Sequence, residues 1–222
     1  MENFQIKIHY AESGFMSDKC YLCGSITQLT RDHVPPKGFF PTPLPNNLIT
    51  VPCCQACNAS YQLDDEAARS FFSIAVGKSA AGDWIWEQKV LGSTVARSPR
   101  FREELIGRIS SPNAADQCTV TLPSERIERF IVRLTKGLIR HYFPDYDYSC
   151  STFHVKHIPP TEESSRIVQE AMAGRTGTFY DERGDGVIRY RYGITDTGLS
   201  GIWFFMFYDA MFYLVMHIRK AA

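Results

Sequence analysis

The sequence predicts an α+β protein: a small strand–strand–helix domain at residues 1–78 held together by paired cysteines, then an α+β domain with an antiparallel sheet at residues 83–222. Three observations support this prediction. Two Cys-x-x-Cys pairs lie near the N-terminus, a long amphipathic helix pattern covers residues 124–142, and short apolar strands with turn signals fill the C-terminal part. The small, polar run at residues 77–82 marks the boundary between the domains.

Five of the seven cysteines lie between positions 20 and 57. Cys20 and Cys23 form one Cys-x-x-Cys pair, and Cys54 and Cys57 form the other. Each pair directs two thiolates at one point, and four thiolates complete the shell of a structural zinc ion. Cys53 competes with Cys54 for the leading position, but Cys54 gives the two-residue spacing. One alternative is a set of unrelated buried thiols, which the clustering of five cysteines argues against. The other is disulfides, which the missing signal-peptide pattern argues against, because the cytosol keeps thiols reduced.

The segment around these cysteines predicts two strands and a helix. Residues 3–9 alternate apolar and polar side chains and predict a short strand ahead of it. Residues 29–34 predict a strand that two prolines stop, because proline cannot donate to a sheet ladder. Residues 48–51 predict the returning strand. The acidic run at 64–66 predicts the start of a helix, since acidic groups favour the positive end of the helix dipole.

Three polar residues lie where the zinc would hold them close together. Asp32-His33 falls between the two cysteine pairs, and Asn58 directly follows the last cysteine. Carboxylate and amide oxygens suit magnesium or manganese, and a histidine serves as a general base near neutral pH. Together they could hydrolyse a phosphodiester. As structural alternatives, His33 would pack against the following prolines and Asn58 would cap a helix.

These residues resemble an HNH endonuclease domain of the ββα-metal class, in its four-cysteine zinc form. The first histidine of the family pattern matches His33, the last position matches Asn58, and the central asparagine falls on Asn46 or Asn47. The resemblance implies that His33 deprotonates the attacking water, that Asp32 and Asn58 hold one magnesium or manganese ion, and that Asn47 pins the catalytic loop. The resemblance covers the N-terminal third of the chain.

Residues 124–142 predict the clearest helix outside this motif, because its apolar residues recur at helical spacing. A basic stripe runs along the same helix, and two further basic residues flank Asp32-His33. The chain has 24 Lys+Arg against 24 Asp+Glu, so nucleic-acid binding would need such a local basic surface. The candidate phosphate contacts are Arg31, Lys37, Arg126, Arg129, Arg133, Lys136 and Arg140. The alternative for the stripe is a solvated helix face.

The C-terminal part predicts a further helix and four strands. Residues 161–173 read as a capped helix. The ranges 179–183 and 187–194 flank a Gly-Asp-Gly turn and predict a hairpin, and 203–208 and 211–218 predict two more strands. Residues 201–218 are apolar except for Asp209, which favours buried strands over a membrane-spanning helix.

The sequence therefore predicts a DNA endonuclease with a structural zinc and a catalytic magnesium or manganese ion. Two alternatives are an inactive zinc-binding interaction or regulatory module, and a nuclease that cleaves RNA. The C-terminal half would select the substrate, a protein partner or a second copy in a homodimer. A restriction, phage-defence or mobile-element role follows by analogy. We expect no membrane association, and the N-terminus lacks a signal-peptide pattern, which predicts a cytoplasmic protein.

Overall fold

The structure is a computed structural model that describes residues 19–113, 118–159, 161–164, 166, 179–194 and 200–219. It confirms an α+β protein with antiparallel sheets. In chain order, its elements are β1 (Leu29–Val34), the 3₁₀ helix η1 (Lys37–Phe39), β2 (Ile49–Cys54), α1 (Gln55–Ser60), α2 (Gln62–Ser73), α3 (Ala80–Trp84), the π-helix η2 (Ile85–Val95), α4 (Pro99–Gly107), α5 (Ser124–Tyr142), β3 (Ser151–Ile158), β4 (Phe179–Arg183), β5 (Ile188–Ile194), β6 (Ser200–Phe207) and β7 (Met211–Arg219).

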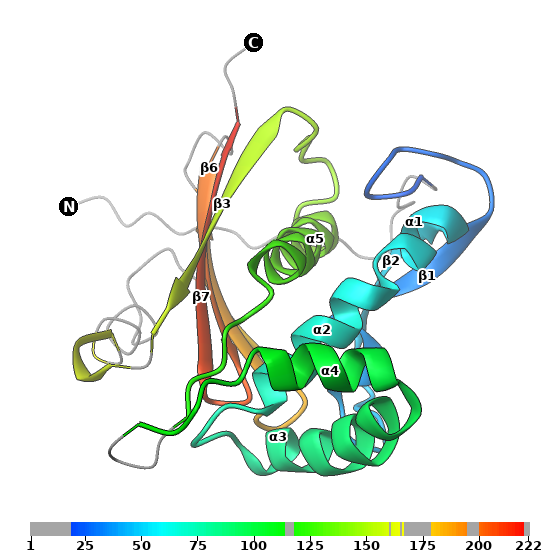
Figure 1. The fold of residues 1–222 in the computed structure, drawn as a ribbon. Coiled ribbons are helices and arrows are strands. Elements are labelled where there is room, and N and C mark those ends of the chain that lie inside the picture. The colour runs from blue at the N-terminus through cyan, green and yellow to red at the C-terminus, as the bar shows by residue number, and fades with distance from the viewer. Residues whose placement is uncertain are drawn as a thin grey trace.

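Two antiparallel sheets lie on opposite sides of one helix. β1 and β2 form a hairpin, and the second sheet has the strand order β3-β7-β6-β5-β4. Figure 1 shows α5 between this sheet and the hairpin. The helix packs on α2, on both hairpin strands, and on β3 and β7. An element from the C-terminal half of the chain therefore reaches the strands that carry the predicted site.

The apolar stripe of α5 explains this central position. Its predicted core residues are all buried, namely Ile127, Phe130, Ile131, Leu134 and Leu138. Phe130 stacks on Phe39 with ring centroids 4.9 Å apart, which joins α5 to the hairpin connection. Buried residues from both predicted domains belong to this one hydrophobic core.

Gly137 lets α5 approach β1 closely. A Cβ atom at this position would lie 2.7 Å from Cγ2 of Val34, closer than packed carbon atoms tolerate. One helical turn earlier, Arg133 occupies the same side of α5, because residues four apart share a helix face. The close approach at Gly137 thus brings Arg133 to the strand.

Several predicted elements are confirmed. β1 and α5 have the predicted bounds, and β2 starts one residue later than expected and continues to Cys54. The predicted hairpin is β4–β5, and the two last strands are β6 and β7. The chain is already helical before the acidic run at 64–66, since α1 begins at Gln55. The predicted strand at 3–9 and most of the predicted helix at 161–173 lie outside the described residues.

The sequence patterns did not predict α3, η2, α4 or β3. The run at 77–82 contains the start of α3, whose N-cap Ser79 donates a hydrogen bond to the Gly186 carbonyl at 2.6 Å. The proposed boundary segment is thus tied to the β4–β5 turn. The division into two folding units stays a prediction.

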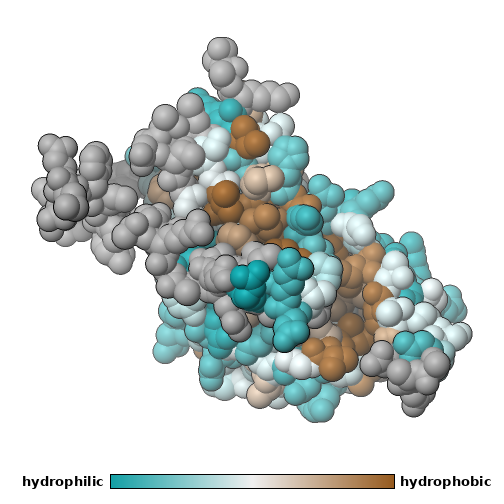
Figure 2. All heavy atoms as spheres, turned by 90° about the vertical axis from the view of Figure 1, so that its left-hand side faces the viewer, coloured by the Kyte–Doolittle hydropathy of each residue, from teal (hydrophilic) through white to brown (hydrophobic). Residues whose placement is uncertain are grey.

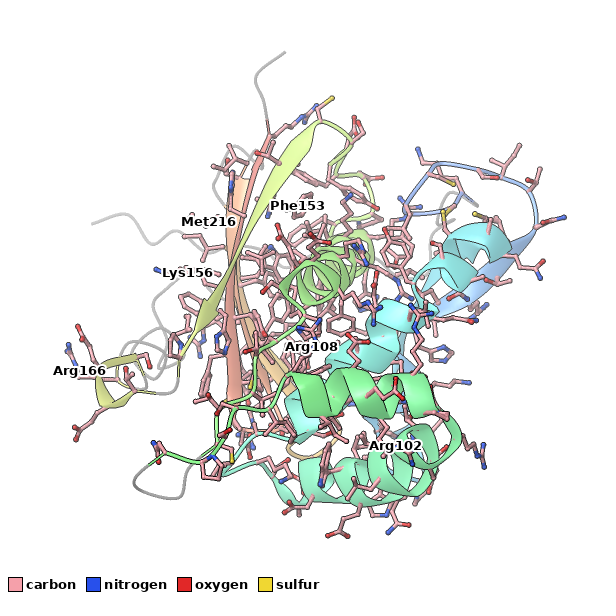
Figure 3. The ribbon with its side chains drawn as sticks, in the orientation of Figure 1. Arg102, Arg108, Phe153, Lys156, Arg166 and Met216 are labelled. Atoms are coloured by element: carbon pink, nitrogen blue, oxygen red, sulfur yellow. The ribbon has the colours of Figure 1, made fainter. Side chains whose placement is uncertain are left out.

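The five-stranded sheet has a partly apolar outer face. On the side away from α5, Ile202, Met216 and Ile218 are between 41% and 47% exposed. Figure 2 views the molecule from this side and shows hydrophobic side chains gathered there among hydrophilic ones. In Figure 3, Met216 and Lys156 project outward from the sheet, whereas Phe153 points toward α5. Among the described helices, none is long and apolar enough to cross a bilayer.

Candidate functional site

Four cysteines gather at the end of the hairpin. Cys20 and Cys23 lie in the turn before β1, Cys54 ends β2, and Cys57 lies in α1. Their Sγ atoms all lie within 4.8 Å of one another, and those of Cys23 and Cys54 are 3.7 Å apart. A tetrahedral zinc with Zn–S bonds of about 2.3 Å requires sulfur atoms about 3.8 Å apart. The four cysteines could therefore hold a metal ion.

The choice between Cys53 and Cys54 follows from strand geometry. Successive side chains of a strand point to opposite faces. Cys54 therefore joins the four-cysteine cluster, and the backbone N–H of Cys57 points at its Sγ at 3.4 Å. Cys53 is not part of the cluster, although its fully buried Sγ lies 4.0 Å from that of Cys20, and burial raises the pKa of its thiol. The cysteine that the two-residue spacing favours is thus the one that lies in the cluster.

The carboxylate of Asp32 is buried and fully engaged. Asp32 is 4% exposed, and the Tyr21 hydroxyl donates to its Oδ2 at 2.7 Å. The guanidinium of Arg133 donates through Nη2 to both carboxylate oxygens at 2.7 Å and through Nε to Oδ2 at 3.2 Å. Burial, reinforced by the Asp32 charge, raises the pKa of Tyr21, so its hydroxyl remains a donor.

Arg133 also contacts other parts of the chain. Its Nη1 donates to Asp65 Oδ1 at 2.5 Å, and its guanidinium lies over the Tyr61 ring, 5.0 Å from the centroid. Burial alone would lower the pKa of Arg133, but the surrounding Tyr21, Asp65 and Asp32 raise it above its ordinary value. One cation from α5 therefore bridges a carboxylate of β1 and a carboxylate of α2.

A second ion pair lies next to this network. Arg129 makes a bidentate pair with Asp64, with donor–acceptor distances of 2.9 and 2.7 Å. Its side chain is 52% exposed, whereas that of Arg133 is 4% exposed. The two arginines thus differ in their access to water, whereas the side chains of Asp32 and Asp64 are both 5% exposed.

The magnesium or manganese site that the resemblance implies does not fit this arrangement. Both oxygens of Asp32 already accept hydrogen bonds from Arg133. Asn58, the second expected ligand, directs its amide nitrogen at Thr30 Oγ1, 3.4 Å away. A divalent cation at Asp32 would have to displace the guanidinium, which carries the same sign of charge.

His33 follows Asp32 on β1 and is half-buried. With Tyr21, Asp32 and Arg133, it borders a small hollow of about 10 Å³, at the lower limit for one water molecule. The other lining residues are apolar: Val34, Pro36, Phe130 and Leu134. Burial lowers the pKa of His33, and the nearby charge of Lys37 lowers it further. The imidazole is therefore neutral at neutral pH, as a general base requires.

The remaining predicted hairpin residues lie at the surface. Asn46 and Asn47 are exposed in the turn before β2, and the role of Asn47 stays a prediction. Arg31 and Lys37 are exposed on either side of His33. Their side chains could reach a phosphate backbone that approaches β1.

The basic stripe of α5 is largely engaged within the protein. Arg126 pairs with Glu104 at 3.4 Å, and Lys136 lies 5.3 Å from the Phe153 ring centroid. Arg140 is buried and donates to the Pro144 carbonyl at 2.7 Å. Arg133 and Arg140 are thus not presented at the surface. Nucleic-acid contact by the stripe stays a prediction, with the half-exposed Arg129 as its most accessible member.

Comparison with known proteins identifies no relative: no protein-family profile, curated protein or solved structure matches the chain.

Sequence reasoning missed the partners of Asp32. Nothing in the sequence singles out Tyr21. The acidic run that contains Asp65 favours a helix start over a metal role, and Arg133 belongs to the predicted basic stripe. Arg133 and Asp32 are 101 positions apart, and no sequence spacing relates them. One available signal was that α5 carries a basic residue one turn before a glycine, which is where a helix can approach another element closely.

Proposed function

We propose that this chain is an HNH-type endonuclease that hydrolyses phosphodiester bonds in DNA. The observation that carries the proposal is the metal-ready cysteine cluster at the end of the β1–β2 hairpin. The same hairpin carries Asp32 and His33, and Asn58 follows the last cysteine of the cluster. A scaffold would need the cysteines alone, so the three polar residues argue for chemistry.

Zinc is the ion that best suits the four cysteines. Four thiolates in a closed tetrahedral shell favour zinc and leave no open position for a substrate. The zinc therefore has a structural role. It fixes the turn before β1 to the β2–α1 junction, and so holds β1 and α1 in one unit.

In the proposed reaction, His33 takes a proton from the water that attacks phosphorus. The P–O3′ bond then breaks, and the 3′ oxygen leaves with a proton from solvent, which gives 5′-phosphate and 3′-hydroxyl ends. The lowered pKa keeps the His33 imidazole neutral, and the adjacent hollow is at the lower limit for one water molecule. Arg31 and Lys37 bind the flanking phosphates. Because Arg133 holds Asp32 in the described arrangement, we route no step through a divalent cation there.

An inactive zinc-stapled interaction module is the second candidate. The observation in its favour is the Arg133–Asp32 pair, which fills the place expected for a catalytic ion with a side chain from the C-terminal half. In that case the hairpin would serve as a binding surface, and Asp32 would have a structural role.

Nicking of supercoiled plasmid by the zinc-loaded protein, with magnesium or manganese, tests the proposal. The wild type is compared with His33→Ala, and zinc content is measured in both. We expect nicking by the wild type and at least a tenfold loss in the variant at unchanged zinc content. Equal cutting by both proteins would contradict the role of His33. Faster cutting of an RNA of matched sequence would assign the substrate to RNA.

A further inference from the structure

We infer that Arg133 is an internal cation that closes the HNH-like site by occupying Asp32, so that a divalent cation binds there only when Arg133 is displaced. This inference rests on the proposed function and concerns the regulation of the same site. It follows from the mismatch between the implied metal ligands and their contacts in the structure.

Arg133 contacts the carboxylate oxygens that a bound metal ion would use. A guanidinium matches a carboxylate with its planar donors, and charge-assisted hydrogen bonds of this kind are the strongest that side chains make. Arg133 reaches both oxygens of Asp32 and one oxygen of Asp65. Two carboxylates from different elements therefore share one buried positive charge.

This arrangement excludes a second cation. A divalent ion needs the same Asp32 oxygens that Arg133 holds at 2.7 Å. If both stayed, two positive charges would lie within a few ångströms of each other in a site of low dielectric, where repulsion is strong. The ion and the guanidinium therefore compete for one carboxylate.

The position of α5 sets this competition. Gly137 of α5 packs against Val34 of β1. One helical turn earlier on α5, Arg133 faces Asp32 of the same strand. Asp65 holds the guanidinium from the α2 side. With 4% of its side chain exposed, Arg133 cannot swing into solvent unless α5 or the hairpin moves. Opening of the site is thus coupled to the packing of the C-terminal half on the hairpin.

Binding of Mn²⁺ to zinc-loaded protein, followed by electron paramagnetic resonance of the free ion, tests the inference. The proteins are the wild type, Arg133→Met, Arg129→Met and the double variant Arg133→Met/Asp32→Asn. We expect Arg133→Met to bind Mn²⁺ at least tenfold more tightly than the wild type. Arg129→Met removes an equally bidentate but half-exposed arginine and should bind like the wild type. The double variant should lose the gained affinity.

Mn²⁺ affinity in Arg133→Met no higher than in the wild type would overturn the inference. A gain that survives Asp32→Asn would place the ion elsewhere and overturn it too. If Arg133→Met does not fold, Arg133→Gln replaces it, because a glutamine amide removes the charge but can still donate a hydrogen bond to Asp32. Its Mn²⁺ affinity should then exceed that of the wild type, and an unchanged affinity overturns the inference.

Measuring Mn²⁺ binding and nucleic-acid cleavage on the same variants distinguishes a failure of this inference from a failure of the proposed function. A variant that gains Mn²⁺ binding but does not cut nucleic acid would uphold the closure by Arg133 and contradict the nuclease. A variant that cuts nucleic acid without any gain in Mn²⁺ affinity would uphold the nuclease and contradict the closure by Arg133.

Discussion

Arg133 of α5 holds both carboxylate oxygens of Asp32 of β1 at 2.7 Å, across 101 positions of sequence. The pair joins the two halves of the chain at the residue that sequence reasoning assigned to metal binding. We expect the pair to contribute to the stability of the hairpin and to block a metal ion at Asp32.

Loss of the Asp32 carboxylate should destabilise the protein strongly. Asp32→Asn leaves a buried guanidinium without its main counter-charge, and breaking a buried pair in this way typically costs about 3 kcal/mol or more. Asp64→Asn is the matched control, because its partner Arg129 is 52% exposed and can turn to water. Because the Asp64 side chain is itself only 5% exposed, we expect the control to cost about 1–2 kcal/mol, less than Asp32→Asn. Urea unfolding of both variants measures the difference, and equal losses would contradict it.

Alanine substitution should change stability in opposite directions at two glycines: Gly137, where α5 packs on β1, and Gly107, which has open space around it. In Gly137→Ala, the new methyl group would lie 2.7 Å from Val34. We expect a loss of about 1–3 kcal/mol from this overpacking. Gly107→Ala, at the end of α4, meets nothing within 4 Å and should be neutral or stabilising by up to about 1 kcal/mol. Thermal unfolding of both variants gives the signs, and a neutral Gly137→Ala would refute the close approach.

Two neighbouring cysteines should differ in their effect on bound zinc. Cys54→Ala removes a ligand of the cluster, and we expect the purified variant to lose its zinc. Cys53→Ala removes a buried thiol outside the cluster and should retain the zinc at reduced stability. Elemental analysis after gel filtration measures both. Retention by Cys54→Ala together with loss by Cys53→Ala would assign the ligand to Cys53.

His217 predicts a loss of stability in acid. It is fully buried on β7, its Nδ1 accepts from Trp203 Nε1 at 3.1 Å, and burial lowers its pKa to about 4. Its unfolded pKa is near 6.5, so the unfolded chain takes up the proton first. Stability should therefore fall by about 3 kcal/mol as the pH drops from about 6.5 to about 4.

Urea unfolding across that pH range checks this loss. His217→Gln should flatten the dependence, whereas the exposed His154→Gln should leave it unchanged. The same slope in His217→Gln as in the wild type would show that other groups cause the acid sensitivity.

The sequence predicted those features that local chemistry determines. The two prolines after Val34 marked the end of β1, the apolar periodicity marked α5, and the Cys-x-x-Cys spacing selected the four clustered cysteines. Each of these signals involves neighbours in sequence, where sterics and periodicity act directly.

The missed features depend on tertiary context. Residues 85–95 form a π-helix, and their mixture of tryptophan, glycine, serine and threonine has no clear helical period. The burial of β3 does alternate, with His154 and Lys156 exposed between less exposed neighbours. Its sequence contains two histidines and a lysine, so the alternation of apolar and polar residues is weak. The partner of Asp32 could not be predicted because it depends on how α5 lies on the hairpin.

The most direct test of the account is plasmid nicking by Arg133→Met compared with Arg133→Met/His33→Ala, both loaded with zinc and supplied with Mn²⁺. The account predicts that the single variant nicks at least tenfold faster than the wild type, and that the double variant binds zinc and Mn²⁺ equally well but loses this activity. If both variants bind Mn²⁺ and neither cuts DNA or RNA, the endonuclease proposal is contradicted, and the zinc-stapled interaction module becomes the better account.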